Sequence, residues 1–228
     1  MARMSASESI AAPGAGQPTS TRPYRQVRAV FDDATITVYQ AYEPGIALAA
    51  IRRGRFSPSY DRTRMTWIKP SFLWMMYRCG WASKEGQEHV LAVRLRRPFF
   101  DEILRRAVPS SFDASRYASV EAWRRALDDS EVRLQWDPDH DPLGRPLERR
   151  AIQLGLRGSM LRRYGETELL SIEDVTPLVI GQRERLERNM EALEMPREEV
   201  YQPESEAAAA VGIDRHEMSS RDRLESEP

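Results

Sequence analysis

The sequence predicts an α+β fold, in which a small and mostly antiparallel sheet carries inserted and flanking helices. Three observations lead to this prediction. Segments rich in β-branched and aromatic residues alternate with segments of helical apolar spacing. Gly, Pro and capping residues mark the breaks between them. At 228 residues, the chain has room for one domain of ordinary size and two tails.

The first three elements follow from composition and from end signals. Residues 35–42, TITVYQAY, are β-branched and aromatic, which favours a strand. Residues 43–54 are predicted to form a helix, because Glu43 and a Pro open the segment, Arg residues close it and Gly54 can cap its end. A short strand is expected at 64–68, RMTWI.

The next helix is predicted at 69–80, where Pro70 or Ser71 opens it and Gly80 closes it. An apolar stripe with the spacing i, i+3, i+4 and i+7 is expected to face the core. The residues of this stripe are Phe72, Met75, Met76 and Cys79. A strand with a buried centre is expected at 88–95.

Helices and strands also alternate in the second half. Amphipathic spacing predicts helices at 98–107 and 119–130. Strands are predicted at 131–136 and 150–156, and the link between them, DPDHDPLGRP, is rich in turn residues. The remaining predictions are a short helix at 158–165 and a long, charged helix at 172–193 that Pro177 interrupts.

The composition of successive segments predicts the limits of the domain and shows how charge is distributed along the chain. Residues 1–21 are expected to be disordered, residues 22–200 to form the single domain, and the acidic residues 201–228 to be mostly disordered. Residues 22–180 hold 26 basic and 21 acidic residues, whereas residues 181–228 hold 7 and 13. A mildly basic body accepts an anionic ligand without requiring nucleic acid.

Several classes of protein are disfavoured. No run approaches the ~20 apolar residues of a membrane span, and the first residues lack the apolar region of a secretory signal. One Cys forms neither an intramolecular disulfide nor a thiolate metal cage. The HExxH, GxSxG, Rossmann and P-loop motifs are absent. We therefore expect a cytoplasmic protein with no membrane partner and no metal; the sequence leaves the oligomeric state open.

The acidic link resembles a calcium loop only in part. Asp137, Asp139, Asp141 and Glu148 have the spacing of EF-hand ligands, but Pro142 takes the place of the required Gly. A strand instead of a helix is predicted before the link. We interpret it as an acidic turn.

Two features are candidates for a ligand site. Residues 64–81 hold three of the five Trp, the only Cys and one of the two Lys. Such aromatic residues either stack on a flat ligand or belong to the core. Gln153 lies between Ala151 and Gly155, whose small side chains leave one face of the strand open. A buried amide needs a partner, which is either the backbone or a ligand.

Three segments together resemble a known family. They are RAVFDDATITVYQAY, RMTWIKPSFLWMMYR with the following GW, and RAIQLGLRG. Their pattern is similar to that of the family called domain of unknown function 4291, and the similar region includes most of the predicted domain. This resemblance implies no established activity.

A second resemblance has chemical implications. The segment ITVYQAYEPGIALAAIRRGRF is similar to the opening unit of ADP-ribosyltransferases, which is a strand ending in Tyr-His-Gly-Thr, then a helix and a Gly-aromatic pair. Tyr39 matches the Tyr, Gln40 replaces the His, and Gly54 with Phe56 matches the closing pair. The Gly-Thr dipeptide is absent.

This resemblance implies a site for NAD. Ser71 and Tyr77 fall in the second unit, where a Ser or Thr and a Tyr flank the nicotinamide. Gln153 falls in the strand that usually supplies a catalytic Glu, although an amide has no basic group to accept a proton. The RNA 2′-phosphotransferase branch of the superfamily works without that Glu and relies on Arg and His.

Our hypothesis from the sequence is an uncharacterised protein that binds a nucleotide, with NAD as a substrate, and transfers ADP-ribose or a related phosphate group. The candidate catalytic residues are Gln153 and Gln40. The candidate binding residues are Tyr39, Trp67, Ser71, Tyr77, Arg28 and Arg150. Two alternatives stay open, namely a non-catalytic nucleic-acid-binding module and a structural or interaction protein.

Overall fold

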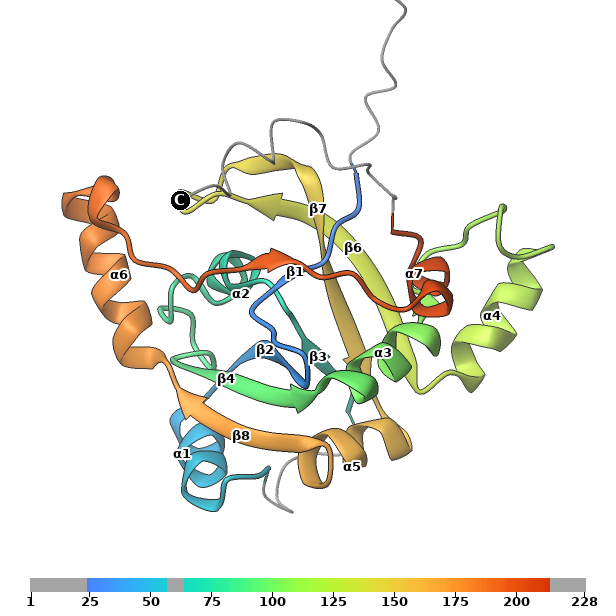
Figure 1. Cartoon of the computed structure of the whole chain (residues 1–228), viewed down its shortest axis with the longest axis horizontal. Coiled ribbons are helices and arrows are strands. Elements are labelled where there is room, and N and C mark those ends of the chain that lie inside the picture. Colours follow the sequence, from blue (N-terminus) through green and yellow to red (C-terminus); the bar gives the residue numbers. More distant parts are fainter. Residues whose placement is uncertain (1–23, 57–63, 214–228) are drawn as a thin grey trace, which may run out of the picture.

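The computed structural model describes residues 24–56 and 64–213 and has the predicted α+β fold (Figure 1). One sheet has the strand order β2–β4–β8, with β2 at Thr35–Tyr42, β4 at His89–Arg96 and β8 at Leu169–Asp174. The other sheet has the order β3–β7–β6–β5, with β3 at Thr66–Ile68, β7 at Pro146–Leu156, β6 at Val132–His140 and β5 at Val108–Pro109. In these two sheets, only β5 and β6 pair in parallel.

Two backbone hydrogen bonds join the sheets edge to edge. The backbone N–H of Tyr39 donates to the oxygen of Lys69 at 2.7 Å, and the N–H of Lys69 donates to the oxygen of Tyr39 at 3.2 Å. Directly paired residues of antiparallel strands project to the same face. The two sheets therefore share one face that carries Tyr39 and Lys69 and an opposite face that carries their neighbours.

Helices cover both faces of this combined sheet. The larger apolar core includes residues of α1 (Pro44–Arg53), α3 (Arg97–Arg105), α5 (Gly158–Glu166) and α7 (Ser205–Val211). The smaller apolar cluster lies on the face of Tyr39 and includes residues of α2 (Phe72–Cys79) and α6 (Thr176–Arg188). Helix α4 spans Val120–Asp129, and a single 3₁₀ turn spans Met190–Ala192. In the described part of the chain, no helix has the length and apolar character needed to cross a membrane.

The C-terminal part of the domain differs from the sequence prediction. Residues 201–213 are ordered, although we expected 201–228 to be mostly disordered. Tyr201 is fully buried and its hydroxyl donates to Asp101 Oδ1 at 2.7 Å, while Ala207 and Val211 of α7 are also buried. A polar, Ala-rich segment has little tendency to fold alone, and contacts with α3 supply the stability that composition does not reveal. Residues 1–21 and 214–228 lie outside the described residues.

The expected helix at 172–193 is also corrected. Its first residues belong to strand β8, which pairs with β4, and the helix begins at Thr176. Pro177 lies in the first turn, where its missing N–H costs nothing, and so it does not interrupt the helix. Two short strands that the sequence did not predict, β1 (Arg28–Ala29) and β9 (Glu199–Val200), pair between α6 and α7 (Figure 1).

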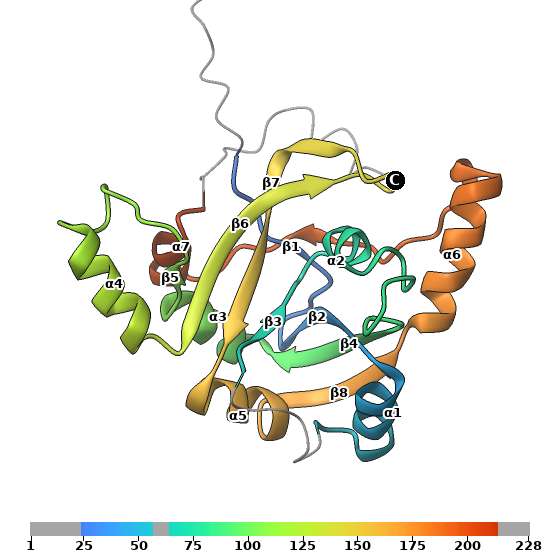
Figure 2. The same cartoon turned by 180° about the vertical axis from the view of Figure 1, so that it is seen from behind.

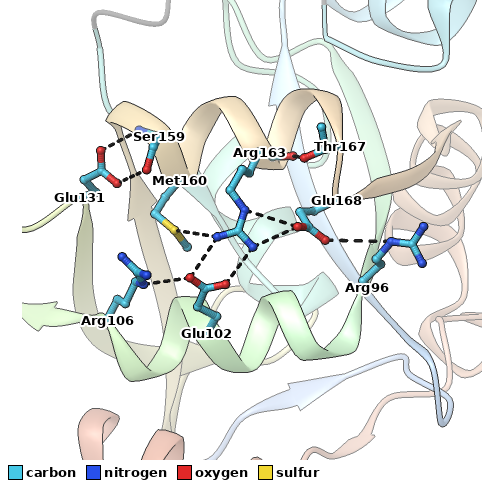
Figure 3. Close-up of polar contacts among 9 residues, drawn as sticks. All are labelled: Arg96, Glu102, Arg106, Glu131, Ser159, Met160, Arg163, Thr167 and Glu168. Carbon is cyan, nitrogen blue, oxygen red and sulfur yellow. Dashed lines mark hydrogen bonds and ion pairs between the residues drawn. The ribbon is translucent and has the colours of Figure 1, made fainter.

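A cluster of ion pairs joins α3, α5 and Glu168, the residue that precedes β8 (Figure 3). Arg163 donates to both carboxylate oxygens of Glu102 at 3.0 and 2.8 Å, and its Nη2 donates to Glu168 at 3.0 Å. These bonds hold the pKa of Glu102 below its ordinary range. Glu131 accepts from the N–H and hydroxyl of Ser159 and thereby caps the start of α5. The arginines of this region therefore have partners and serve the fold.

Candidate functional site

A row of polar side chains crosses the junction of the two sheets. Tyr39 of β2 is bridged to Lys69, and the β3–β7 register, continued by one residue, brings Lys69 opposite Gln153. Gln153 in turn faces Gln135 of β6. Strands β3, β7 and β6 lie next to one another in Figure 2. From this register, the side chains of Tyr39, Lys69, Gln153 and Gln135 project to one face.

Two amides hold one carboxylate at the end of this row. Gln153 Nε2 donates to Asp137 Oδ2 at 2.7 Å, and Gln135 Nε2 donates to Asp137 Oδ1 at 2.9 Å. Because each carboxylate oxygen has its own donor, the orientation of the carboxylate is fixed. Carboxylate oxygens have further lone pairs, so Asp137 can still accept from a ligand. We call Lys69, Gln135, Asp137 and Gln153 the polar cluster.

Lys69 is the most unusual member of the polar cluster. It is only 6% exposed, and in the described part of the chain its ammonium group makes no hydrogen bond or ion pair. Burial, together with the nearby positive charge of Arg78, lowers the pKa of Lys69 to about 8, while the negative charge of Asp137 acts in the opposite direction. Near neutral pH the polar cluster therefore contains a buried cation that lacks a close counterion.

An aromatic stack stands beside the polar cluster where α2 meets β6. The rings of Tyr77 and His140 are parallel with centroids 3.5 Å apart, and Trp74 stacks on both at 5.5 Å. Trp74 Nε1 and His140 Nδ1 are buried and have no hydrogen-bond partner among the described residues. This boundary between α2 and β6 therefore contains two buried polar groups that no described residue satisfies.

Glu198 approaches the site from the segment that precedes β9. Its carboxylate accepts from the N–H of Phe72, the first residue of α2, and its backbone oxygen accepts from Arg28 Nη2 at 2.8 Å. Burial raises the pKa of Glu198 to about 7, and the negative charge of Asp139 acts in the same direction. Asp139 itself is paired with Arg149 at 2.7 Å.

The structure brings together some of the residues that the sequence singled out. Gln153 and Tyr39 belong to the same row, and Trp67 faces Gly155, two residues from Gln153 on the same face. Ser71 caps α2 by accepting from the N–H of Trp74 at 3.4 Å. These positions agree with a shared site, although Ser71 already has a structural role.

Other candidates lie elsewhere. Gln40 is on the opposite face, where its Nε2 donates to the oxygen of Trp67 at 3.2 Å and its Oε1 accepts from Tyr164 at 2.5 Å. Gln40 and Gln153, the two candidate catalytic residues, therefore lie on different faces of the combined sheet, because neighbouring residues of a strand, such as Tyr39 and Gln40, project to opposite faces. Tyr77 belongs to the aromatic stack, Arg28 holds Glu198, and Arg150 donates to the oxygen of Trp136 at 3.2 Å.

Each end of the polar row lines a hollow. At the Tyr39 end, a hollow of 420 Å³ lies over β2, β4 and β8 and is also lined by Phe72, Arg94 and Glu173. At the Gln135 end, a hollow of 490 Å³ lies at the edge of β6. The described residues contain no group of three His, Cys, Asp or Glu side chains placed to hold a metal ion.

Sequence reasoning missed Lys69, Asp137 and Glu198. Lys69 carried one usable signal, because the chain has 32 Arg and only two Lys, so a Lys is a rare residue here. Asp137 was interpreted as part of an acidic turn, whereas it lies within β6. Glu198 carried no local signal, because its role depends on a contact with α2 across 126 residues.

Comparison with known protein families shows which family the chain belongs to. The family described as Domain of unknown function (DUF4291) matches residues 26–201. The chain belongs to this family. The DUF4291 region spans β1 to β9 and contains the whole polar cluster together with Glu198. No curated protein matches the chain at a significant level.

Proposed function

We propose that this DUF4291 protein binds a nucleotide such as NAD at the polar cluster and transfers ADP-ribose or a related phosphate group. One observation carries the proposal: Lys69 is a buried cation that makes no ion pair with any described residue, and it shares the polar cluster with a carboxylate that two amides hold in place. The resemblance of the Tyr39 segment to ADP-ribosyltransferases agrees with this choice of ligand.

The energetics of Lys69 favour an anionic ligand. Burying an ammonium group without a counterion costs several kcal/mol by order-of-magnitude estimates. The fold would avoid this cost with an apolar residue, which suggests that Lys69 is present for a reason other than stability. A phosphate or carboxylate group of a ligand would supply the missing negative charge.

Asp137 supplies the carboxylate that Gln153 lacks. The resemblance leads one to expect an acid on strand β7, and the Gln153 amide instead holds the Asp137 carboxylate at 2.7 Å. A carboxylate in that place would accept a hydrogen bond from a ribose hydroxyl and stabilise positive charge on the ribose when its bond to nicotinamide breaks. Trp67, on the same face, offers a ring for stacking.

Calorimetric titration of NAD and ADP-ribose tests this function. Wild-type protein should bind at least one of them, and Lys69→Met and Asp137→Asn should each weaken binding roughly tenfold or more. The matched control is Lys84→Met, because Lys84 is exposed and, within residues 24–56 and 64–213, its Nζ donates to the backbone oxygens of Tyr77 and Arg78 and to no side chain. Release of nicotinamide from NAD, followed by chromatography, reports turnover and should slow in Asp137→Asn.

Two outcomes would contradict the proposal. One is the absence of binding by folded wild-type protein at millimolar NAD and ADP-ribose. The other is binding that Lys69→Met and Asp137→Asn leave unchanged. Binding of an oligonucleotide that falls steeply with salt and is indifferent to Lys69→Met would instead favour the nucleic-acid-binding alternative.

A further inference from the structure

The hollow at the edge of β6 has features of its own. Strand β5 ends after two residues, and the last bond along this edge runs from the N–H of Ser110 to the oxygen of Leu134 at 2.8 Å. Beyond this bond the chain turns away from β6 and leaves a hollow of 490 Å³. Its polar and aromatic lining includes Arg25, Arg116, Arg150, Ser110, Gln135 and Trp136.

The lining has an excess of positive charge. It contains three Arg residues and a single acid, Asp113, whose carboxylate already accepts from the N–H and hydroxyl of Ser115 at 2.9 and 2.6 Å. Within the described residues, Arg116 and Arg150 have no carboxylate at ion-pair distance. Each donates to one backbone carbonyl, that of Ala210 and that of Trp136 respectively. A guanidinium has five N–H donors, so most of theirs remain unused.

An unused hydroxyl completes the arrangement. Ser110 Oγ is buried, and no hydrogen-bond partner for it exists in residues 24–56 and 64–213. Planar guanidinium groups bind phosphate oxygens through paired N–H donors, and a serine hydroxyl adds a further donor. Phosphate oxygens accept several such bonds at once, which matches donors that converge from different segments.

We propose that this hollow is a phosphate-binding site for a phosphate ester or diphosphate. Its position links it to the polar cluster, because Gln135 lines the hollow and also donates to Asp137. If the proposed function holds, the hollow receives the diphosphate of the nucleotide while the ribose lies at Asp137. The phosphate site itself rests only on the hollow and its donors.

Calorimetric titration of inorganic pyrophosphate tests the site without reference to NAD. Arg116→Ala should weaken pyrophosphate binding roughly tenfold or more, and Ser110→Ala should weaken it by about threefold or more. Arg125→Ala, on the exposed side of α4, is the matched control and should bind as wild type does. Ser110→Ala removes a hydroxyl that has no partner among the described residues, so it keeps the test valid if Arg116→Ala disturbs α7.

The outcomes separate the two proposals. Pyrophosphate binding that depends on Arg116 and Ser110 but not on Lys69 supports the phosphate site, whatever NAD does. Binding that Lys69→Met abolishes and both Arg116→Ala and Ser110→Ala leave intact overturns the phosphate site and leaves the function at the polar cluster standing. No binding of pyrophosphate by wild-type protein at millimolar concentration also overturns it.

Discussion

At the scale of single residues, Lys69 combines a charged group with burial. The chain uses Arg at 32 of its 34 basic positions, yet this buried position holds Lys. An Arg guanidinium stays charged at every accessible pH, whereas a buried Lys can share its proton with solvent. With a pKa of about 8, Lys69 is mostly charged at neutral pH and becomes neutral in mildly alkaline solution.

Replacing Lys69 should stabilise the protein at neutral pH. The folded-state pKa of about 8 lies below the ordinary value of 10.5, so the native state loses stability as the pH falls through about 8. Lys69→Met removes this loss and should raise the free energy of unfolding at pH 7 by up to about 3 kcal/mol. Urea denaturation measures the change, and Lys84→Met should lie within about 0.5 kcal/mol of wild type. A clear destabilisation by Lys69→Met at pH 7 would show that Lys69 serves the fold.

Glu198 should make stability depend on pH in the opposite sense to a paired carboxylate. Burial raises its folded-state pKa from 4.5 to about 7, so its contribution is fully present below pH 4.5 and is lost as the pH rises to about 7. The Glu198→Gln variant keeps an oxygen that accepts from Phe72 and has no such ionisation. Its stability relative to wild type should therefore increase between pH 5 and pH 8, as measured by denaturation midpoints. An unchanged difference between the two pH values would refute this assignment.

At the scale of elements, local signals placed the helices and distant partners fixed their ends. Helix α2 begins at the Ser71 cap and ends at Gly80, whose φ of 58° suits a residue without a side chain. Helix α5 depends on a partner from another strand, because Glu131, next to the start of β6, caps its first turn. Gly158, with φ of 59°, allows this close approach.

Substituting Gly158 should test the attachment of α5. A Cβ at Gly158 would collide with the Glu131 carboxylate and would also sit in the left-handed region. Gly158→Ala should therefore destabilise the protein by about 2–3 kcal/mol, through backbone strain and the loss of the cap. The control is Gly181→Ala within α6, where a Cβ meets no atom within 4 Å and where stability should rise by up to about 1 kcal/mol. Equal thermal melts for the two variants would contradict this account.

At the scale of the whole molecule, the last described segment completes the core. Tyr201, Ala207 and Val211 are fully buried, and Trp136 Nε1 donates to the oxygen of Val211 at 2.9 Å. The buried carboxylate of Asp101 accepts a hydrogen bond from the Tyr201 hydroxyl. The segment after β9 is therefore an integral part of the domain.

Ending the chain at Val200 should destabilise it strongly. The buried Tyr201 and Val211 side chains alone contribute at least about 4 kcal/mol of burial free energy, and Asp101 loses its partner. The reference is a chain that ends at Ile213, which retains α7. Thermal melting followed by circular dichroism compares the two chains. Similar melting temperatures would mean that the segment 201–213 contributes little to the fold.

The sequence by itself determined most of the elements, because their signals are local. The strand at 35–42 and the helices near 43–54 and 69–80 follow from β-branched composition, apolar spacing and caps, all within a few residues. The same patterns determined the α+β class. Gln153 was found in this way, since a strand amide between small residues is visible in the sequence.

Only the tertiary structure decided which side chains meet. The β3–β7 register, which pairs segments more than 80 residues apart, set Lys69 opposite Gln153. The bridge between Tyr39 and Lys69 then put Gln40, the neighbour of Tyr39, on the other face. Strand β8 formed where a helix was expected because pairing with β4 overrode local preference. The polar cluster exists because the fold brings Asp137 and Gln153 within one hydrogen bond, and the burial that shifts the pKa of Lys69 is likewise a property of the folded chain.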